Sequence, residues 1–385
     1  MKIVYIVTNL NNRGGTERIL TDKANYLSSV FGYDVSIITC TQRPDELNAY
    51  YLSKQIKQIN LDIRYYTVYK YKYPKRLWMK IKMARLLRKE LTETVCQIAP
   101  DIIIGVGHYK ADLICTLHCK STKIIECHDG RMITSILYQK QERSHISRLY
   151  MLFYQWAYFR KIEHHADIIV TQTVGAKEKW RKAKSVVIIP NFSLMPITHY
   201  SPCNSKRIIA VGRLGWEKGY DRLIDIWEIV SKKHTDWQLD IFGDGDGDGI
   251  KDKLLNKINK NNISNILIHP STDNISEEYM NSSILVLTSY FEAFSLVILE
   301  AMMHGVPCVA FDCPYGPKSL IANGNCGFLI ENGNVNSFVD KLCCLIENEN
   351  LRLQFSAAAI KQAMNFDAEI IMNKWKLLFE KVSNK

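Results

Sequence analysis

The 385-residue sequence lacks the features that would assign it at once to several classes of protein. No apolar run approaches the roughly 20 residues that a membrane-spanning helix needs, so we expect no transmembrane segment. The apolar part of M-K-I-V-Y-I-V-T-N-L is short and lacks a small-residue cleavage site, which indicates a first strand and not a signal peptide. The eleven cysteines include no C-x-x-C pair, which predicts free thiols and no zinc framework. The sequence therefore predicts a cytoplasmic globular protein.

Two ligand-binding motifs are incomplete. The G-x-G-x-x-G dinucleotide fingerprint is absent, because the first apolar run is followed by N-L-N-N-R-G-G-T-E-R, where Gly14 and Gly15 form a lone glycine turn. The run F-G-D-G-D-G-D-G resembles the start of an EF-hand loop, but the twelfth position counted from Asp244 is Leu255 and not glutamate. We therefore expect no calcium site and no other bound metal.

The length and the charge distribution predict two domains with different partners. At 385 residues the chain exceeds the size at which one core keeps growing, so two domains of about 190 residues are expected. Residues 1–197 carry 31 Lys and Arg against 16 Asp and Glu, whereas the remainder carries 19 against 23. A basic first half and a slightly acidic second half suggest that each half meets a different ligand.

Short apolar runs alternate with helical patterns along both halves, which predicts an α/β protein with mostly parallel, doubly wound sheets. The first set of strands is expected at 2–7, 35–39, 102–106, 123–126 and 168–171, and the second at 207–211, 238–242, 265–269, 284–287 and 307–311. The expected division is a first domain over 1–190, a proline-rich linker over 191–206, a second domain over 207–365 and a terminal helix over 366–385. That helix either caps the second domain or crosses back to the first. Two such domains around one linker predict a cleft.

The segment 289–305, S-Y-F-E-A-F-S-L-V-I-L-E-A-M-M-H-G, places Glu292 and Glu300 eight positions apart. If this spacing is helical, it covers about two turns and brings both carboxylates to nearly the same face. A strand precedes the segment, so Glu292 is expected at the carboxyl edge of a sheet, where open α/β sheets bind ligands. The amides of 294–296 would then face an anion. The pair suits a sugar nucleotide. The alternative is that both glutamates lie on the solvated edge of a half-buried helix, which is the more common case for such a spacing.

Three further side chains are expected at strand ends. His128 follows the run I-I-E-C, where an imidazole could bind a sugar hydroxyl, although a lone histidine is more often structural. Arg213 and Lys218 follow a strand in A-V-G-R-L-G-W-E-K-G and suit a diphosphate. The alternative is a solvated loop with ordinary surface charges.

These motifs occur in an order that resembles a known family. G-G-T-E-R, H-D, V-G-R-L-x-x-x-K-G, the G-D-G loop, E-A-F-S-L-V-I-L-E-A-M and D-C-P-Y-G-P together resemble the family 4 retaining glycosyltransferases of the GT-B fold over nearly the whole chain. Only the E-x7-E segment with its flanks is specific by itself. The resemblance implies two Rossmann-like domains facing across a cleft, with the acceptor bound mainly by the first and the nucleotide-sugar by the second.

The resemblance also implies roles for residues of the nucleotide-sugar site. Arg213 and Lys218 would hold the diphosphate, with the amides of Ser295 and Leu296 completing the phosphate site. No bound metal would then be needed, because cationic side chains and a helix N-terminus replace it. Ser295 stands where the family often has glycine.

The remaining roles concern the sugar and the ribose. Glu300 would bind the ribose hydroxyls and Glu292 the transferred sugar. His128 would touch that sugar, and Gly15 would approach the phosphate or sugar from the other side. Ser319 stands where the family commonly has glutamate, so these residues leave the identity of the sugar open.

The segment 64–89 carries ten Lys and Arg, five Tyr and one Trp, with no acid. One helical stripe in it is apolar and is expected to pack on the sheet: Leu77, Ile81, Ala84, Leu87 and Leu91. Basic residues are worth about 1 kcal/mol each at an anionic leaflet, and Tyr and Trp favour the interface. We therefore predict peripheral contact with the inner face of the membrane. No nucleic-acid motif accompanies the segment, so no nucleic-acid partner is expected.

Together these features predict a hexosyltransferase-type enzyme. It would move a sugar from a nucleoside diphosphate sugar, by resemblance a UDP-sugar, to a saccharide acceptor that is lipid-linked, in bacterial surface polysaccharide synthesis. A GT-B-like sugar-nucleotide epimerase and a non-catalytic, membrane-associated sugar-nucleotide-binding protein are the alternatives. The sugar, the acceptor, the linkage and the oligomeric state stay open.

Overall fold

The chain folds into two compact units, which are described separately below. The computed structural model describes residues 1–72, 74–107, 110–128, 145–245, 249–321 and 325–383. The first unit comprises Met1–Gln172, Ala176–Ile189 and Met372–Lys385, and the second comprises Thr173–Gly175 and Pro190–Ile371.

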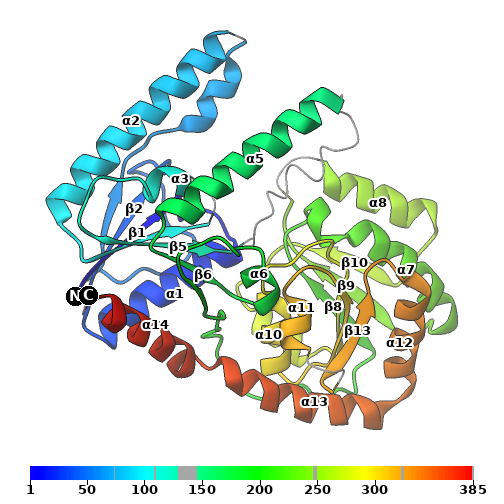
Figure 1. Ribbon diagram of the computed structural model, residues 1–385. Coiled ribbons are helices and arrows are strands. Elements are labelled where there is room, and N and C mark those ends of the chain that lie inside the picture. The colour runs from blue at the N-terminus through cyan, green and yellow to red at the C-terminus, as the bar shows by residue number, and fades with distance from the viewer. Residues whose placement is uncertain (73, 108–109, 129–144, 246–248, 322–324, 384–385) are drawn as a thin grey trace. The chain divides into compact units, whose positions relative to one another are not determined.

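The first unit contains a parallel sheet of seven strands in the order β3-β2-β1-β4-β5-β6-β7 (Figure 1). Its strands are β1 (Lys2–Val7), β2 (Asp34–Thr39), β3 (Lys57–Asn60), β4 (Ile102–Val106), β5 (Thr122–Cys127), β6 (Ile168–Thr171) and β7 (Val186–Ile188). Its helices are α1 (Gly15–Ser29), η1 (Tyr65–Lys70), α2 (Lys75–Ile98), α3 (Ala111–Ile114), α5 (His145–His165), the second half of α6 (Val174–Lys177) and most of α14 (Ala368–Ser383). The central strand β1 is apolar and buried after its first residue, as expected for a strand that helices cover on both faces.

Helices α2, α3 and α5 share one face of this sheet. Leu87, Ile114 and Phe159 come from these three helices and belong to one buried cluster with Ile103 of β4 and Ile125 of β5. Each fully buried side chain of this kind contributes about 1.5–3 kcal/mol. This packing holds the three helices against β4 and β5.

The apolar stripe expected to pack along α2 does so only in part. Leu87 and Leu91 are fully buried, whereas Leu77 and Ile81 are each 45% exposed. The first two turns of α2 therefore extend past the core and leave apolar side chains in solvent.

The C-terminal helix contributes to the first unit. Residues 372–385 belong to it, although the chain reaches them directly from the second unit. Trp375 and Phe379 of α14 are buried, and the Phe379 ring lies 6.4 Å from that of Tyr33. The helix expected over 366–385 begins at Ala368, because η5 (Met364–Phe366) and Asp367 separate α14 from the helix before it.

The second unit contains a six-stranded parallel sheet in the order β10-β9-β8-β11-β12-β13. Its strands are β8 (Arg207–Val211), β9 (Gln238–Phe242), β10 (Ile266–His269), β11 (Ile284–Leu287), β12 (Cys308–Asp312) and β13 (Gly327–Glu331). Its helices are η3 (Trp216–Lys218), α7 (Tyr220–Lys233), α8 (Ile250–Lys260), α9 (Ile275–Met280), α10 (Leu296–Met303), α11 (Pro317–Leu320), α12 (Val335–Glu347), α13 (Glu349–Ala363) and η5. These two sheets and their helices confirm the α/β, doubly wound fold class.

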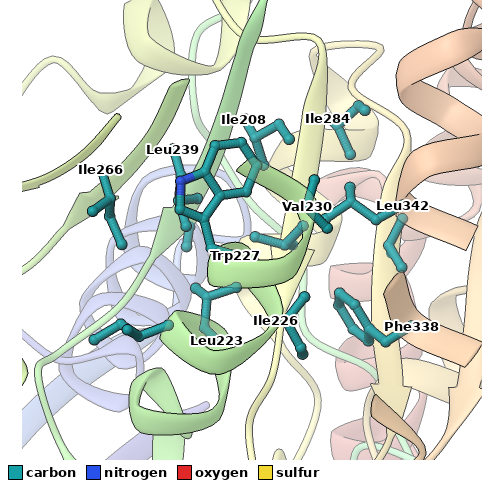
Figure 2. Close-up of a cluster of buried hydrophobic side chains, with 14 of the residues drawn as sticks. Ile208, Leu223, Ile226, Trp227, Val230, Leu239, Ile266, Ile284, Phe338 and Leu342 are labelled. Carbon is teal, nitrogen blue, oxygen red and sulfur yellow. The ribbon is translucent and has the colours of Figure 1, made fainter. Parts of the chain in front are cut away.

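One face of the second sheet is covered by α7 and α12. Figure 2 shows Trp227 of α7 at the centre of this core, with Ile208 of β8 and Leu239 of β9 above it in the view and Phe338 of α12 at the lower right. The indole Nε1 still has a partner, since it donates to the Asn265 carbonyl at 3.1 Å. This core fixes α7, and with it the loop that leads into α7 from β8.

The segment 191–206, predicted as a linker, contains no helix or strand but packs on the second unit. The Ser201 amide donates to the His304 carbonyl at 2.8 Å, and Arg352 Nε donates to the Cys203 carbonyl at 2.8 Å. The segment is therefore a bonded part of the second unit.

Candidate functional site

The candidate site of the second unit consists of two loops that leave adjacent strands. One loop follows β8 and the other follows β11, and these two strands pair in parallel. The carboxyl ends of parallel strands meet at the same edge of a sheet, which is where open α/β sheets bind ligands.

Lys218 and Glu292 form the buried ion pair of this site. Lys218 Nζ lies 2.8 Å from Glu292 Oε1, and the two side chains are 21% and 9% exposed. Ser289 Oγ donates to the same carboxylate oxygen at 2.6 Å. Burial opposes the charged form of Lys218, but the Glu292 carboxylate and the nearby Glu217 outweigh it and raise the pKa of Lys218. The site therefore holds a permanent ammonium group at neutral pH.

The two loops are bonded directly to each other. Gly219, which ends η3, has φ +63°, and a Cβ there would lie 2.2 Å from the Thr288 carbonyl oxygen. Thr288 Oγ1 in turn donates to the Gly219 carbonyl at 2.9 Å, and the Tyr290 amide donates to the Glu217 carbonyl at 2.8 Å. Only glycine combines this backbone conformation with so close an approach.

Arg222 was not predicted from the sequence, yet it organises the same loops. From the first turn of α7 its guanidinium donates to the carbonyls of Thr288 and Ser289, and to Asn332 Oδ1 at 2.9 Å. It also stacks on the Phe311 ring at 4.2 Å. A lone arginine in an amphipathic helix carries no sequence signal, because only the fold reveals that its face points inward.

Glu292 lies in the turn after β11, as expected, and not on the helix that carries Glu300, so their spacing does not correspond to two turns of one helix. It lies in an extended loop, where its amide donates to the Pro314 carbonyl at 2.9 Å and its carbonyl accepts from the amides of Tyr315 and Gly316. These bonds join the loop after β11 to the loop after β12. They explain why Glu292 faces Lys218 and not the helix.

Ser295 and Leu296 mark the start of α10. Ser295 is the N-cap residue in the left-handed region, with φ +71°, and its side chain is buried. Helix α10 begins at Leu296. Its first amides lie at the N-terminus of a helix, where backbone donors and the helix dipole favour an anion.

Glu300 is buried one turn into α10 with 4% exposure. Its Oε2 accepts from the Tyr279 hydroxyl at 3.1 Å, and its carbonyl lies 2.7 Å from His304 Nδ1. The Tyr279 and His304 rings are stacked at 5.4 Å. Glu300 is thus a positioned carboxylate and not a solvated helix edge.

Arg213 is the most accessible charged group of the loop after β8. Its side chain is 56% exposed, and its Nη2 lies 2.7 Å from Glu217 Oε1. Arg213 and Lys218 therefore stand in one loop, each beside a carboxylate.

The two predicted site residues of the first unit are Gly15 and His128. Gly15 is the exposed first residue of α1. His128 directly follows β5 and is buried, with its Nε2 3.3 Å from Glu126 Oε1. Asp129 and Gly130, which follow it, are outside the described residues.

A buried ion pair beneath His128 was also not predicted. Glu126 of β5 contacts Lys23 Nζ of α1, and both side chains are 1% exposed. Burial opposes ionisation of Glu126, but Lys23 and His128 outweigh it and lower its pKa to about 2. Burial lowers the pKa of Lys23, against the pull of Glu126. Lys23 also lies 4.9 Å from the centre of the Trp375 ring.

Other expectations concern metals, membranes and cysteines. Within the described ranges, no group of three or more His, Cys, Asp or Glu side chains could hold a metal ion. Asp244 Oδ1 accepts from the Ser271 amide at 3.2 Å, while Asp246 and Asp248 lie outside the described residues. No helix among the residues described is long and apolar enough to cross a membrane. All eleven cysteines are described and are free thiols.

Comparison with known proteins extends these observations. Residues 199–362 match the family described as Glycosyl transferases group 1, and residues 13–192 match Glycosyltransferase Family 4. An uncharacterized glycosyltransferase of Haemophilus influenzae is 30% identical over 383 residues, which cover 97% of this chain and 99% of the relative. The amylovoran biosynthesis glycosyltransferase AmsD of Erwinia amylovora is 34% identical over 203 residues, 50% of this chain and 55% of the relative.

A solved structure shows the same fold. The crystal structure of a TarM variant of S. aureus, in complex with fondaparinux, alpha-GlcNAc-glycerol and UDP, aligns with a TM-score of 0.76. The alignment covers 98% of this chain and 99% of that chain at 17% identity. At 17% sequence identity, this similarity shows that the two chains share a fold.

Proposed function

We propose that this chain, which belongs to the group 1 glycosyltransferases of the GT-B fold, is a retaining enzyme. It would transfer the sugar of a UDP-sugar to a saccharide acceptor with retention of configuration. The chain is a transferase, and its relative AmsD is named for the biosynthesis of amylovoran. The TarM structure contains UDP, which supports a uridine nucleotide as the donor. The acceptor we propose is lipid-linked, in bacterial surface polysaccharide synthesis.

The observation that carries the proposal is the Lys218–Glu292 pair at the edge of the second sheet. An ammonium group that is 21% exposed and held at 2.8 Å from a carboxylate is positioned before any ligand arrives. An anion binds such a cation with a more favourable free energy than it binds a fully solvated cation, because few water molecules need to be displaced. A diphosphate therefore suits Lys218, with Arg213 beside it.

The proposed chemistry is departure of the UDP diphosphate from the face that the acceptor hydroxyl attacks. As the bond between the sugar C1 and the diphosphate oxygen breaks, negative charge grows on that oxygen. Lys218 and Arg213 stabilise this charge, together with the amides of Ser295 and Leu296. No protein nucleophile is assigned, and the acceptor proton leaves with the diphosphate.

The carboxylates orient the donor in this proposal. Glu300 accepts hydrogen bonds from the ribose hydroxyls, and its contact with Tyr279 holds it in place. Glu292 accepts from hydroxyls of the transferred sugar, and Ser289 fixes the carboxylate plane. His128 touches the same sugar, and Gly15 approaches the donor phosphates.

The basic segment 64–89 supports the lipid-linked acceptor. Tyr66, Tyr69 and Trp78 are each about 60% exposed, and Lys82 Nζ lies 5.4 Å from the centre of the Trp78 ring. Exposed aromatic rings beside cations suit the interface of an anionic membrane. We therefore propose peripheral contact with the inner leaflet.

A transfer assay tests the proposal. Membrane extract supplies the acceptor, and a panel of radiolabelled UDP-sugars supplies the donor. Wild-type protein should move label from one donor into a lipid-soluble product, and Lys218→Ala should abolish this without loss of circular dichroism. Full activity of Lys218→Ala would refute the site, and product formed without acceptor would show an epimerase instead. Retention is read from the anomeric coupling constant of the product.

A further inference from the structure

A cavity of about 290 Å³ lies in the first unit, and none of the candidate site residues lines it. Its walls come from α2, α3 and α5, the three helices that share one face of the sheet, and from Lys110, which directly precedes α3. Its volume is at the lower limit of ligand pockets, which run from about 300 to 1,000 Å³, so it suits a headgroup and not a whole nucleotide sugar.

The charges around the cavity have mainly one sign. Arg85, Arg88, Lys110 and Lys161 line it, with Asp112 as its carboxylate. Lys161 Nζ pairs with Asp112 Oδ2 at 3.1 Å, which leaves a clear excess of positive charge. Such an excess in a concave site attracts a multiply charged anion.

Two of the cations are held in place by the fold. Arg88 donates to the Thr116 carbonyl at 3.3 Å and to Thr116 Oγ1 at 3.1 Å. Lys110 has a left-handed backbone with φ +54°, and its Nζ lies 3.7 Å from the centre of the Tyr65 ring. Burial lowers the pKa of Lys110, which Asp112 opposes and Lys80 reinforces. A bound anion would stabilise the charged form of Lys110, which burial disfavours.

Both α2 and α5 also carry exposed apolar side chains. Ile81 lines the cavity and is 45% exposed, and Leu77 and Trp78 precede it by about one turn. On α5, Phe153 and Trp156 are stacked at 5.8 Å and are 64% and 57% exposed, about one to two turns before Lys161. Monomeric proteins rarely expose so many large apolar side chains together unless a partner covers them.

We propose that this cavity binds the phosphate or diphosphate group of a lipid, with the apolar side chains of α2 and α5 against its hydrocarbon. Arg85, Lys110 and Lys161 donate to the phosphate oxygens, and Arg88 supplies charge from its fixed position. The assignment rests on the proposed function in one respect, which is that the lipid carries the acceptor saccharide. It differs from general attraction to an anionic surface, because it requires a phosphate group that can enter a cavity.

Two double variants separate the cavity from the surrounding charge. Arg85→Gln/Lys161→Gln removes two cations of the cavity, and glutamine at 161 can still donate to Asp112. Lys82→Gln/Lys89→Gln removes two exposed cations of the same helix α2 that do not line the cavity. The net charge changes equally in both.

Binding is measured by flotation on phosphatidylcholine vesicles that carry either phosphatidic acid or phosphatidylglycerol, matched in zeta potential. Phosphatidic acid offers an accessible phosphomonoester, whereas the phosphate of phosphatidylglycerol is a diester. Wild-type protein should prefer phosphatidic acid by about tenfold, the effect of one charge-assisted hydrogen bond. The cavity variant should lose this preference, and the control variant should keep it while binding both vesicles more weakly.

Equal binding of wild-type protein to both vesicles, or equal loss of preference in both variants, would overturn the proposal. Inorganic pyrophosphate is added as a soluble competitor. If it abolishes the preference and also binds the lipid-free protein in an Arg85-dependent manner, the cavity is a general phosphate site and its assignment to a lipid is wrong. None of these readouts requires UDP or sugar transfer, so failure of the proposed function would leave them unchanged.

Discussion

The Lys23–Glu126 pair in the first unit allows a quantitative test of how the fold is held. Glu126 has its pKa lowered from 4.5 to about 2 by Lys23 and His128, against burial. At about 1.4 kcal/mol per pH unit, this difference corresponds to about 3 kcal/mol of folding free energy at neutral pH. The lowered pKa of Lys23 offsets part of this gain, because burial disfavours its ammonium form.

Removal of one partner of the Lys23–Glu126 pair should lower the free energy of unfolding by more than the intact pair contributes to it. Lys23→Met leaves the Glu126 carboxylate buried at 1% exposure, and loss of one partner of a buried pair costs about 3–5 kcal/mol. Glu126→Gln should cost a similar amount, because it leaves the ammonium without its carboxylate. The double variant should cost no more than the larger single loss, since neither buried charge remains.

The assay is urea unfolding of the full chain, followed by circular dichroism and tryptophan fluorescence. Trp375 is a direct probe, because it lies 4.9 Å from Lys23 Nζ. Lys232→Met is the control, because its pair with Glu228 is exposed and should change stability by less than about 1 kcal/mol. Additive losses in the double variant, or single losses as small as that of the control, would refute the reasoning.

The pH dependence has a defined sign. The folded-state pKa of Glu126 lies below its unfolded value, so its stabilisation is complete above pH 4.5 and is lost as the pH falls toward 2. Wild-type protein should therefore lose stability over this interval more steeply than Glu126→Gln. Parallel stability curves for the two proteins would contradict the assigned charge state.

Three further predictions concern the second unit. Gly219→Ala should lower stability by about 2 kcal/mol or more and reduce sugar transfer, because its Cβ would collide with the Thr288 carbonyl; urea unfolding and the transfer assay check this. Arg222→Met should cost about 3 kcal/mol and raise the KM for the donor, since it removes the donor to two buried carbonyls; equal stability and KM would count against that role. Ser295→Gly should raise the melting temperature with transfer retained, because Ser295 has φ +71°, and a lower melting temperature would show that the buried hydroxyl contributes.

The sheets were predictable because their strands are short apolar runs that need no tertiary information. β8, at Arg207–Val211, coincides with its prediction, and β1 at Lys2–Val7 does as well. The fold class and the family were therefore accessible from the order of these runs and the motifs between them. The packing of the amphipathic helix α2 was less predictable, because hydrophobic periodicity does not indicate which turns of a helix extend past the core.

The site was predictable in residue types but less so in geometry. The spacing of Glu292 and Glu300 did not indicate that the Glu292 carbonyl accepts from the amides of Tyr315 and Gly316, far along the chain. Arg222 and Lys23 carry no sequence signal, because a single basic residue in a helix is usually solvated. Their roles depend on carbonyls and carboxylates that only the folded chain brings to them.

The central claim is that the second unit binds the nucleotide of a UDP-sugar, and isothermal titration with UDP tests it most directly. Wild-type protein should bind one UDP per chain. Glu300→Gln should bind at least about tenfold more weakly, because it replaces the carboxylate that we propose accepts from the ribose hydroxyls, while it keeps an acceptor for Tyr279. Glu278→Gln, an exchange on the neighbouring helix α9, is the matched control and should bind as the wild type does. Absence of UDP binding by the wild type, or unchanged binding by Glu300→Gln, would contradict the account.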